Sequence, residues 1–326
     1  MHRRAFFIDL HNDVMEVAID GYQLGVRHTT HHSDLPRFRD GGVDAQMISI
    51  WVDPNRFPST AYQQSMRIID SFQVQVGRYS GELAQARTSV EIQQANAAGK
   101  LAGVLGIEGG HAIENDLTKL ISLYQRGGRY LTITWNNSTA WATAAADVQS
   151  ATRGLSDFGR QVIRTMDSLG MIIDVSHTGI KTIEDILATT TNPIIASHSG
   201  ARALRNHYRN LTDAQLVAIA QRGGVVGVVF YPPFLSSTST VNMDTVIKHI
   251  DYIKNLIGID HVAIGSDFDG IEVTPVGLED VTKFPSLTMA LMKRGYSSSD
   301  IRKLLGENYL RVYRAVCEQQ TRLTNR

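Results

Sequence analysis

Residues 6–13 read FFIDLHND, and this stretch indicates both a fold and a kind of site. The apolar run at 6–8 is typical of a buried β-strand, and it ends abruptly in Asp9, His11 and Asp13. Because side chains alternate along a strand, His11 and Asp13 are able to point the same way. Taken alone, the stretch has two interpretations: a strand followed by a polar turn, or a strand that ends in half of a metal site. The other polar residues of the chain distinguish between them.

Similar apolar runs recur along the chain of 326 residues, with longer amphipathic stretches between them. The runs lie at 6–11, 43–50, 102–109, 130–135, 171–177, 193–199, 225–230 and 261–267. Most are continuously hydrophobic, which is typical of parallel strands buried on both faces. Strand–helix alternation carried eight times predicts an α/β fold, a (β/α)8 TIM barrel that forms one domain over residues 1–326. A doubly wound parallel sheet is the main alternative.

Three helices have clear start or stop signals. The stretch 154–170 has Ser156 as its expected N-cap and Gly170 as its expected C-terminal stop. In the stretch 211–224, Thr212 is the expected N-cap and Gly223 the expected stop. A third helix is expected at 297–316, which begins with Ser and Asp residues. The polar stretch 23–40 is expected to be a long loop after the first strand.

The overall composition excludes several classes of function. Lys+Arg and Asp+Glu both number 32, and this zero formal net charge argues against nucleic acid or an anionic membrane as the main partner. The one cysteine, Cys317, permits no internal disulfide and is expected to pack in a C-terminal helix. No signal peptide or membrane span is recognisable, so a cytoplasmic location is expected.

Polar residues with metal-binding chemistry follow most of the predicted strands. They are His11 and Asp13, Glu108, His177, His198, and Asp267 with Asp269. In a barrel all these strand ends meet at one face, where the active site lies. Any one strand-end histidine is more often a hydrogen-bonded structural residue, but the joint pattern favours a site. Asp9 is expected to brace the barrel instead, and His111 is a weak candidate for supporting a ligand.

Imidazole and carboxylate ligands indicate a divalent metal, with zinc favoured. One tetrahedral ion needs four ligands. The five candidate ligands exceed that number, so two zinc ions are expected; the candidates are His11, Asp13, Glu108, His177 and His198. Glu108 is the natural bridge between them, because a carboxylate has two oxygens to share. A two-metal site activates water and polarises a carbonyl or phosphoryl group, so the predicted reaction class is hydrolysis.

The sequence resembles the membrane dipeptidase (renal dipeptidase) family, peptidase family M19, over nearly its whole length. The matching motifs are DLHND at 9–13, GIEGGH at 106–111, GLSDFG at 154–159, MIIDVSH at 171–177, ASHSGAR at 196–202, RN at 209–210, GSDFDG at 265–270 and GENYLRVY at 306–313. The resemblance implies a zinc-dependent dipeptidase on a metal-dependent hydrolase barrel. It leaves a homodimer open.

The resemblance also implies a role for each site residue. His11 and Asp13 would hold one zinc ion, His177 and His198 would hold the other, and Glu108 would bridge the two ions. Asp267 would take a proton from the metal-bridging water, which attacks the dipeptide carbonyl as hydroxide, and pass the proton to the leaving amine. Arg209 would bind the terminal carboxylate of the substrate.

One position departs from the family pattern. Where the family has a histidine that contacts the substrate carbonyl, the stretch LTITWNN has Trp135. Indole offers a single N–H donor and cannot become cationic, so this position leaves the substrate open. The alternatives are an amidohydrolase for another small amide or modified amino acid, a tryptophan that only fills space at the barrel mouth, and a metal-binding barrel without catalytic activity.

Overall fold

The computed structural model describes residues 1–238 and 240–318 of the chain. These residues form one sheet with nine strands, and all the strand pairs are parallel. The strands are β1 (Ile8–Asn12), β2 (Ala45–Trp51), β3 (Leu83–Gln85), β4 (Leu101–Glu108), β5 (Gly128–Thr132), β6 (Ile172–Asp174), β7 (Ile195–Ser199), β8 (Val225–Val228) and β9 (Val262–Ile264).

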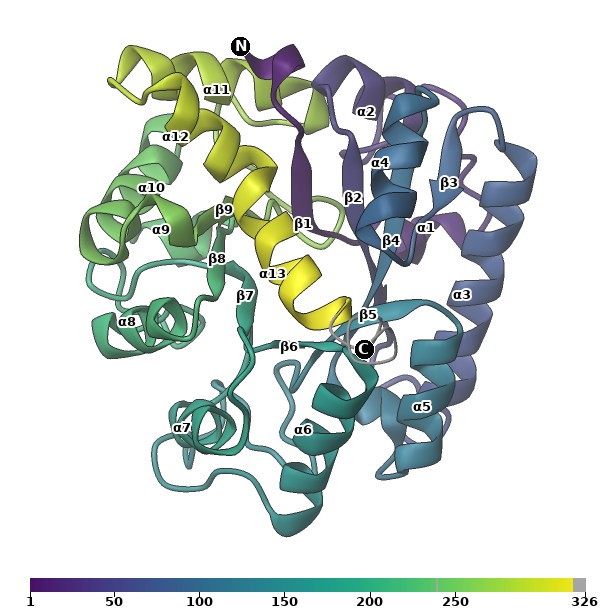
Figure 1. The fold of residues 1–326 in the computed structure, drawn as a ribbon, viewed down its shortest axis with the longest axis vertical. Helices are drawn as coiled ribbons and strands as arrows, with labels where there is room; N and C mark the ends of the chain where they lie inside the picture. Colours follow the sequence, from purple (N-terminus) through teal and green to yellow (C-terminus); the bar gives the residue numbers. More distant parts are fainter. Residues whose placement is uncertain (239, 319–326) are drawn as a thin grey trace, which may run out of the picture.

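Eight of the strands form a nearly closed barrel in the order β1-β2-β4-β5-β6-β7-β8-β9 (Figure 1). The ring closes just after β9, where Phe268 forms a parallel bridge with Asn12 and accepts a hydrogen bond of 2.9 Å from the backbone N–H of Asp13. This closure confirms the predicted barrel and rules out the doubly wound sheet. The short strand β3 lies outside the ring and pairs with β4, and the sequence analysis missed it.

Helices alternate with the barrel strands. The α-helices in the described residues are α1 (Val14–Ala18), α2 (Leu35–Gly41), α3 (Ala61–Arg78), α4 (Ser89–Ala97), α5 (Leu117–Gln125), α6 (Asp157–Leu169), α7 (Ile180–Thr189), α8 (Asp213–Gln221), α9 (Pro232–Leu235), α10 (Met243–Ile257), α11 (Phe284–Lys293), α12 (Ser298–Arg302) and α13 (Asn308–Cys317). Within this part of the chain, none is long and apolar enough to span a bilayer.

The predicted caps of α6 and α8 are confirmed. The Ser156 hydroxyl accepts the N–H of Gly159, and Gly170 ends α6 in the left-handed conformation. Thr212 forms a capping box with Gln215 at the start of α8. The helix expected at 297–316 is present as α12 and α13, joined by a π-helical turn.

The long loop expected at 23–40 is wrong in its second half, because α2 begins at Leu35. Asp34 is the N-cap, and its carboxylate accepts hydrogen bonds from the backbone N–H (2.8 Å) and the guanidinium Nε (2.6 Å) of Arg37. Pro36 lies in the first turn, where its fixed φ suits a helix and its missing N–H costs nothing. The signal for the start of this helix, Asp34 followed by Pro36, was present in the sequence but was missed because the stretch is rich in polar residues.

The barrel strands divide their apolar side chains between two clusters. Met47 of β2 belongs to a cluster inside the ring, whereas its neighbour Ile48 belongs to the larger cluster between the strands and the surrounding helices. Alternating positions on β4 divide in the same way, with Val104 in the inner cluster and Leu105 in the outer one. Both faces of the strands are therefore buried, as their continuous hydrophobic runs predicted.

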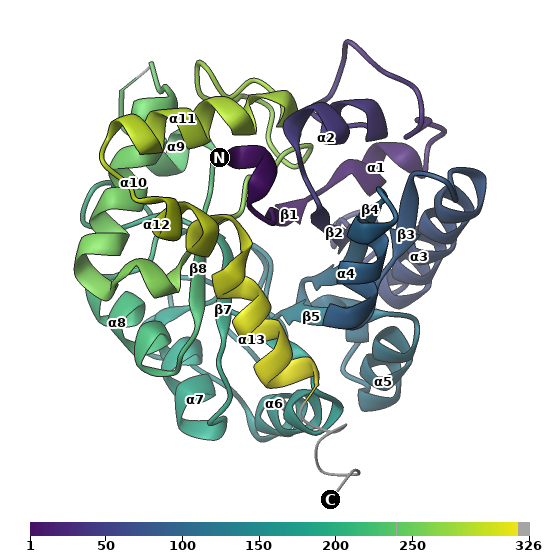
Figure 2. The ribbon, with the colours of Figure 1, turned by 45° about the horizontal axis from the view of Figure 1, so that its top comes forward.

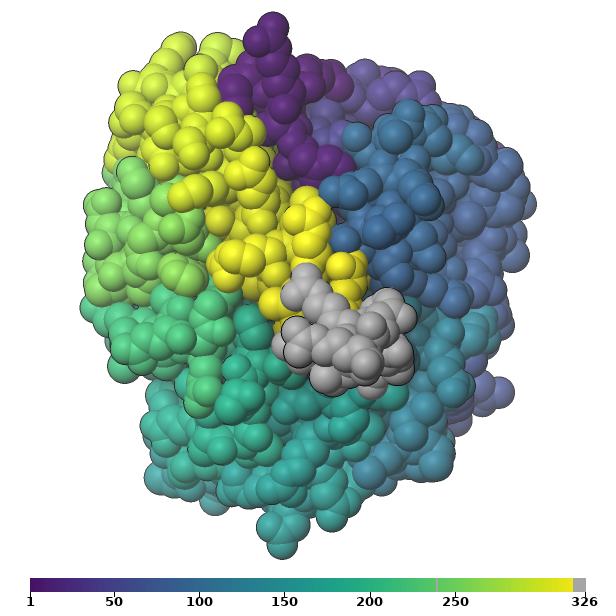
Figure 3. Space-filling model, viewed as in Figure 1, coloured from purple at the N-terminus to yellow at the C-terminus, as the bar shows by residue number. Residues whose placement is uncertain are grey.

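Helix α13 closes the amino-terminal end of the barrel. Its Tyr309 and Tyr313 join the inner cluster with apolar residues at strand starts, namely Ile8, Ala45, Ala102, Ile172, Ile195 and Val225. Figures 1 and 2 show α13 crossing this end, and Figure 3 shows the C-terminal helices (yellow) running across this face beside the N-terminal segment (purple). Cys317, the last residue of α13, packs against the same cluster, which confirms its predicted packing role.

The strand register sets up the opposite end. Trp51 pairs with Glu108, Glu108 with Thr132, and Thr132 with Asp174. These last residues of β2, β4, β5 and β6 therefore lie in one row across the carboxyl-terminal mouth of the barrel.

Candidate metal centre

The structure brings the six predicted metal and acid–base residues together at the carboxyl-terminal mouth. They are His11 in β1, Asp13 at the start of α1, Glu108 at the end of β4, His177 after β6, His198 in β7 and Asp267 after β9. Their ligand atoms form three groups, each with all atoms within 4.8 Å of one another. The groups are His11, Asp13 and Glu108; Glu108, His177 and His198; and His11, His198 and Asp267.

Glu108 lies between two sets of ligands. Its Oε2 is 3.3 Å from His11 Nε2, whereas its Oε1 is 3.1 Å from His177 Nε2 and 3.6 Å from His198 Nε2. The Ser49 hydroxyl donates a hydrogen bond of 3.1 Å to Oε2 and helps to fix the carboxylate. Each oxygen of one carboxylate therefore faces a different set of histidines.

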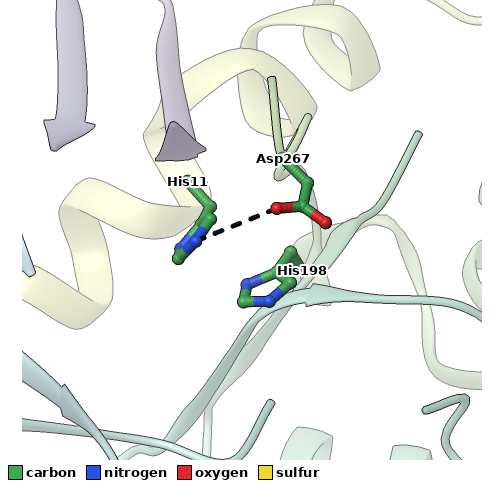
Figure 4. Close-up of side chains that lie close together, drawn as sticks. All are labelled: His11, His198 and Asp267. Carbon is green, nitrogen blue, oxygen red and sulfur yellow. Dashed lines mark ion pairs between the residues drawn. The ribbon is translucent and has the colours of Figure 1, made fainter. Parts of the chain in front are cut away.

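The spacing of the remaining atoms suits metal binding. His11 Nε2 is 3.2 Å from Asp13 Oδ2, and the Nε2 atoms of His177 and His198 are 3.0 Å apart. Ligands about 2.0–2.2 Å from a tetrahedral zinc ion lie about 3.3–3.5 Å from one another, close to these separations. Asp267 lies slightly farther away, with Oδ1 at 3.9 Å from His11 Nε2, and Figure 4 shows it converging with His11 and His198.

Two buried atoms of this cluster lack a hydrogen-bond partner. Among the described residues, neither His11 Nε2 nor Asp13 Oδ1 makes a hydrogen bond, although both side chains are almost fully buried. An unpaired buried polar atom is costly, and a bound cation would satisfy both. The donor set, its spacing and its unpaired atoms therefore fit divalent metal ions.

Each histidine is oriented by a hydrogen bond at its other nitrogen. His11 Nδ1 lies 3.0 Å from the Tyr130 hydroxyl, His177 Nδ1 lies 3.0 Å from Asn136 Oδ1, and His198 Nδ1 lies 2.8 Å from the Ser197 hydroxyl. These oxygens are suited to accept an N–H, which leaves each Nε2 free to face the centre. Such supporting bonds fix the tautomer and the ring direction of metal-binding histidines.

Asp174 supports His198 through Ser197. The Ser197 hydroxyl donates 2.6 Å to Asp174 Oδ2, and the same carboxylate accepts the Thr132 hydroxyl at 2.6 Å. Tyr130, Ser197 and Asp174 were given no role in the sequence analysis, because only the strand register reveals their contacts. Their signal in the sequence was limited to polar residues within otherwise apolar runs.

The pKa values of the cluster follow from its burial and mutual contacts. Burial alone would raise the pKa of Glu108, but charge interactions with His11 and His177 outweigh it and lower that pKa well below its usual range. Burial and the nearby Arg209 cation lower the pKa of His177 to about 3, so its ring is neutral, which is the form that binds metals. Burial raises the pKa of Asp267 well above its ordinary value, and Asp13 and Glu108 add to this.

The backbone is unusual at two of these positions. His177 and Asp267 have φ angles of +63° and +65°, in the left-handed region that side-chain-bearing residues rarely adopt. Such conformations are concentrated at functional sites. Gly270 is needed beside them, because a Cβ atom there would lie 2.3 Å from Asp13 Oδ2.

A cavity of about 320 Å³ opens beside the cluster. Arg209 lines it and is only 2% exposed, and its Nε and Nη1 make no hydrogen bond in the described part of the chain. The guanidinium is held by Nη2, which donates 3.2 Å to the His198 carbonyl, and by the Phe234 ring at 5.1 Å. A buried cation that lines a cavity and has two nitrogens without a hydrogen-bond acceptor suits a carboxylate ligand.

Trp135 also lines the cavity, as expected from its position at a strand end. Its ring centroid lies 5.1 Å from that of Trp51 and 6.2 Å from that of His177. Trp51, at the end of β2, was not singled out in the sequence analysis. The two indoles form an aromatic part of the cavity wall.

Glu16 is a further cavity residue that the sequence analysis missed. It lies on α1, three residues after Asp13, and is half-buried. Burial and the carboxylates of Asp13, Glu108 and Asp267 raise the pKa of Glu16 to about 9. Its position one helical turn after a predicted ligand was the only signal in the sequence.

Three other polar residues lie outside the cluster. Asp9 accepts hydrogen bonds from Gln46 Nε2 (3.0 Å) and the Ser266 N–H (2.8 Å), which links β1 to β2 and to the end of β9 and agrees with the expected bracing role. Asp269 accepts the His32 N–H at 2.7 Å and belongs to none of the three ligand groups. His111 donates to the Val52 carbonyl (2.8 Å) and supports no ligand directly.

The candidate histidine and carboxylate ligands lie beside a cavity at the carboxyl-terminal mouth of the barrel, and together with the matches below they define this protein as a metal-dependent hydrolase. The family model for membrane dipeptidase, peptidase family M19, matches residues 1–326. The chain therefore belongs to this family, which confirms the resemblance seen in its motifs.

Solved structures agree with this assignment. Dipeptidase AC, a metallopeptidase of family M19, is 28% identical over 96% of this chain and 98% of its own, with a TM-score of 0.89. A metallopeptidase from Rhodobacter sphaeroides, liganded with a phosphinate mimic of the dipeptide L-Ala-D-Ala, is 27% identical over 96% and 99%, with a TM-score of 0.88. An amidohydrolase from Pseudomonas aeruginosa is 26% identical over 98% of both chains, with a TM-score of 0.84.

Proposed function

We propose that this protein hydrolyses the amide bond of dipeptides with two zinc ions bridged by Glu108. The observation that carries the proposal is that the two oxygens of Glu108 face separate sets of ligands, His11 with Asp13 on one side and His177 with His198 on the other. The dipeptide mimic bound by the related Rhodobacter sphaeroides enzyme supports the substrate class. The related peptidases favour dipeptides over the other small amides considered for Trp135.

Two bound zinc ions would activate a water molecule and polarise the scissile carbonyl. The transfer of the proton from this water to the leaving amine is assigned to a protein residue. Asp267 lies beside His11 and faces the cavity, so that its carboxylate is able to accept a proton from the attacking water and return it to the leaving amine. A raised pKa suits a carboxylate that must both accept and release a proton near neutral pH.

Arg209 positions the substrate in this proposal. Its two free N–H groups would bind the terminal carboxylate and hold the peptide bond over the ligand cluster. A buried, unpaired cation gains most from such a partner, because its own desolvation cost is otherwise uncompensated. This requirement for a carboxylate would limit cleavage to the peptide bond next to the C-terminus of the substrate.

Turnover and metal content measured together test the proposed function. We expect the purified protein to bind about two equivalents of zinc and to cleave Xaa-Gly or Xaa-D-Ala dipeptides faster than N-acyl amino acids. Preference for the N-acyl amino acids would identify an amidohydrolase of another specificity. Bound metal without turnover on the whole panel would identify a barrel that has lost catalysis.

Asp267→Asn tests the proton transfer. The substitution keeps the size of the side chain but removes its basicity, and we expect turnover to fall about 10³-fold, within the range for loss of general acid–base catalysis. Zinc content by elemental analysis should stay at the wild-type level. Turnover close to that of the wild type would remove Asp267 from the mechanism.

A further inference from the structure

The cavity beside the candidate metal ligands is lined by an arginine, Arg209, and by a glutamate, Glu16, that comes from a different part of the barrel mouth. Arg209 lies in the segment after β7, whereas Glu16 lies on α1, which follows β1 and packs against β2. In the ring order β1-β2-β4-β5-β6-β7-β8-β9, β2 and β7 are separated by three strands in either direction. They therefore face each other across the barrel mouth, with the predicted metal ligands between them.

Neither of these ionisable side chains has a partner that neutralises it. The Glu16 carboxylate makes no hydrogen bond or ion pair with any described residue, although it is half-buried, and the charged groups that affect it most are other carboxylates. On the other side, Arg209 is 2% exposed and has two N–H groups without an acceptor. Partly buried charges are normally paired, so the cavity suits a ligand with one positive and one negative end.

Glu16 is not part of the predicted metal site. It belongs to none of the three ligand groups, whereas Asp13, one turn earlier, belongs to the group with His11 and Glu108. Of the charged groups that affect Glu16 most, His11 is the one that favours its ionised form, and His11 already contacts Asp13 and Glu108. A cation for Glu16 has to come from another source, and the substrate is the one molecule that the cavity must admit.

We propose that Glu16 binds the ammonium group of the substrate's N-terminal residue, opposite the carboxylate held by Arg209, and so selects dipeptides with a free amino terminus. This inference rests on the proposed dipeptidase function. A dipeptide has these two charges at its ends and the scissile amide between them, which matches the order of Glu16, metal ligands and Arg209 across the cavity.

The aromatic wall supports the same reading of the cavity. Trp51 lies at the end of β2, on the side of Glu16, and its ring centroid is 5.1 Å from that of Trp135. Both indoles line the cavity. Tryptophan faces attract ammonium groups through their ring electrons, so they would add to the attraction by Glu16. This gives Trp135 a role at the amine end of the substrate.

The experiment compares two substrates that differ only in charge. Glycyl-alanine has an ammonium group where N-propionyl-alanine has a methyl group of similar size. Wild-type protein should cleave glycyl-alanine with the higher kcat/KM. In Glu16→Gln this kcat/KM should fall about 10- to 100-fold, as expected for loss of a hydrogen bond between charged groups, and the fall should be mainly in KM. The kcat/KM for N-propionyl-alanine should stay unchanged.

The control is Glu114→Gln, the same change in a half-buried glutamate that pairs with Lys119 outside the cavity. It should leave both substrates unaffected. Zinc content and thermal unfolding of Glu16→Gln should equal those of the wild type. Equal losses for both substrates, or a loss of zinc, would show that Glu16 acts through the metal site and would overturn the inference, as would an unchanged preference for glycyl-alanine.

A binding measurement separates this inference from the proposed function. Calorimetry with a phosphinate dipeptide mimic and with its analogue lacking the amino group reports on recognition without turnover. Glu16→Gln should weaken binding of the first about 10-fold or more and leave the second unchanged. If the wild type cleaves no dipeptide, the proposed function fails, and these two affinities still decide the role of Glu16. Equal effects on both ligands would refute it.

Discussion

The two ends of the barrel are built from the same strands and differ completely in chemistry. At the amino-terminal end, β1 contributes Ile8 to a cluster closed by Tyr309 and Tyr313 of α13. At the carboxyl-terminal end, the same strand contributes His11, and the segment after it contributes Asp13. One end is packed with apolar side chains, whereas the other holds buried ionisable side chains beside a cavity, and several of their polar atoms make no hydrogen bond in the described part of the chain.

The difference shows how this fold separates stability from function. The apolar end gains free energy from burial without the need for a ligand. At the polar end, buried atoms such as His11 Nε2 and Arg209 Nη1 make no hydrogen bond within the described residues. They cost free energy until a metal ion or substrate binds. Substitutions at the polar end should therefore change metal binding and turnover, and substitutions at the apolar end should change the free energy of unfolding.

The largest effect is expected for Glu108→Gln at the polar end. Glu108 is the one carboxylate that belongs to both the His11 group and the His177 group, and an amide is a much poorer metal ligand. We expect zinc content to fall below two equivalents and turnover to fall about 10³-fold or more, because both metal positions lose a ligand. Elemental analysis and kcat measurements would show this. Two retained equivalents of zinc would contradict the bridging role.

The barrel itself could be predicted from the sequence because its signals are local. Continuous apolar runs such as 171–177 and capped helices such as α6 report their own secondary structure, and the alternation of the two fixes the topology. The short strand β3 and the helix α2 were missed, since each depends on tertiary pairing or lies within a polar stretch.

The candidate site could be predicted in part, because some of its residues also have local signals in the sequence. His11, Glu108, His177 and His198 follow apolar runs, and their chemistry is visible in their residue type. Glu16 was not singled out in the sequence analysis, because a side chain without a partner is recognisable only when its neighbours in space are known. Tyr130 was missed for the same reason.

A medium effect is expected for Tyr130→Phe, which removes one hydroxyl near the polar end. That hydroxyl lies 3.0 Å from His11 Nδ1, and the tyrosine is fully buried. Without it, the His11 ring loses the partner that orients it, and zinc affinity should fall about 10- to 100-fold, as for other supporting hydrogen bonds of metal ligands. Competition with a chelator of known affinity would measure this. An unchanged affinity would mean that packing alone orients His11.

The smallest effect is expected for Tyr313→Phe, the same loss of one hydroxyl at the apolar end. Tyr313 is also fully buried and belongs to the same inner cluster as Tyr130, but its hydroxyl has no hydrogen-bond partner among the described residues. Removing an unpaired buried hydroxyl should raise the free energy of unfolding by about 1 kcal/mol and leave zinc affinity and kcat/KM unchanged. Denaturant unfolding of both tyrosine variants would test the contrast directly. If Tyr313→Phe instead lowers the stability by a similar amount, the hydroxyl has a partner such as a buried water, and the amino-terminal end is not the purely apolar counterpart of the site.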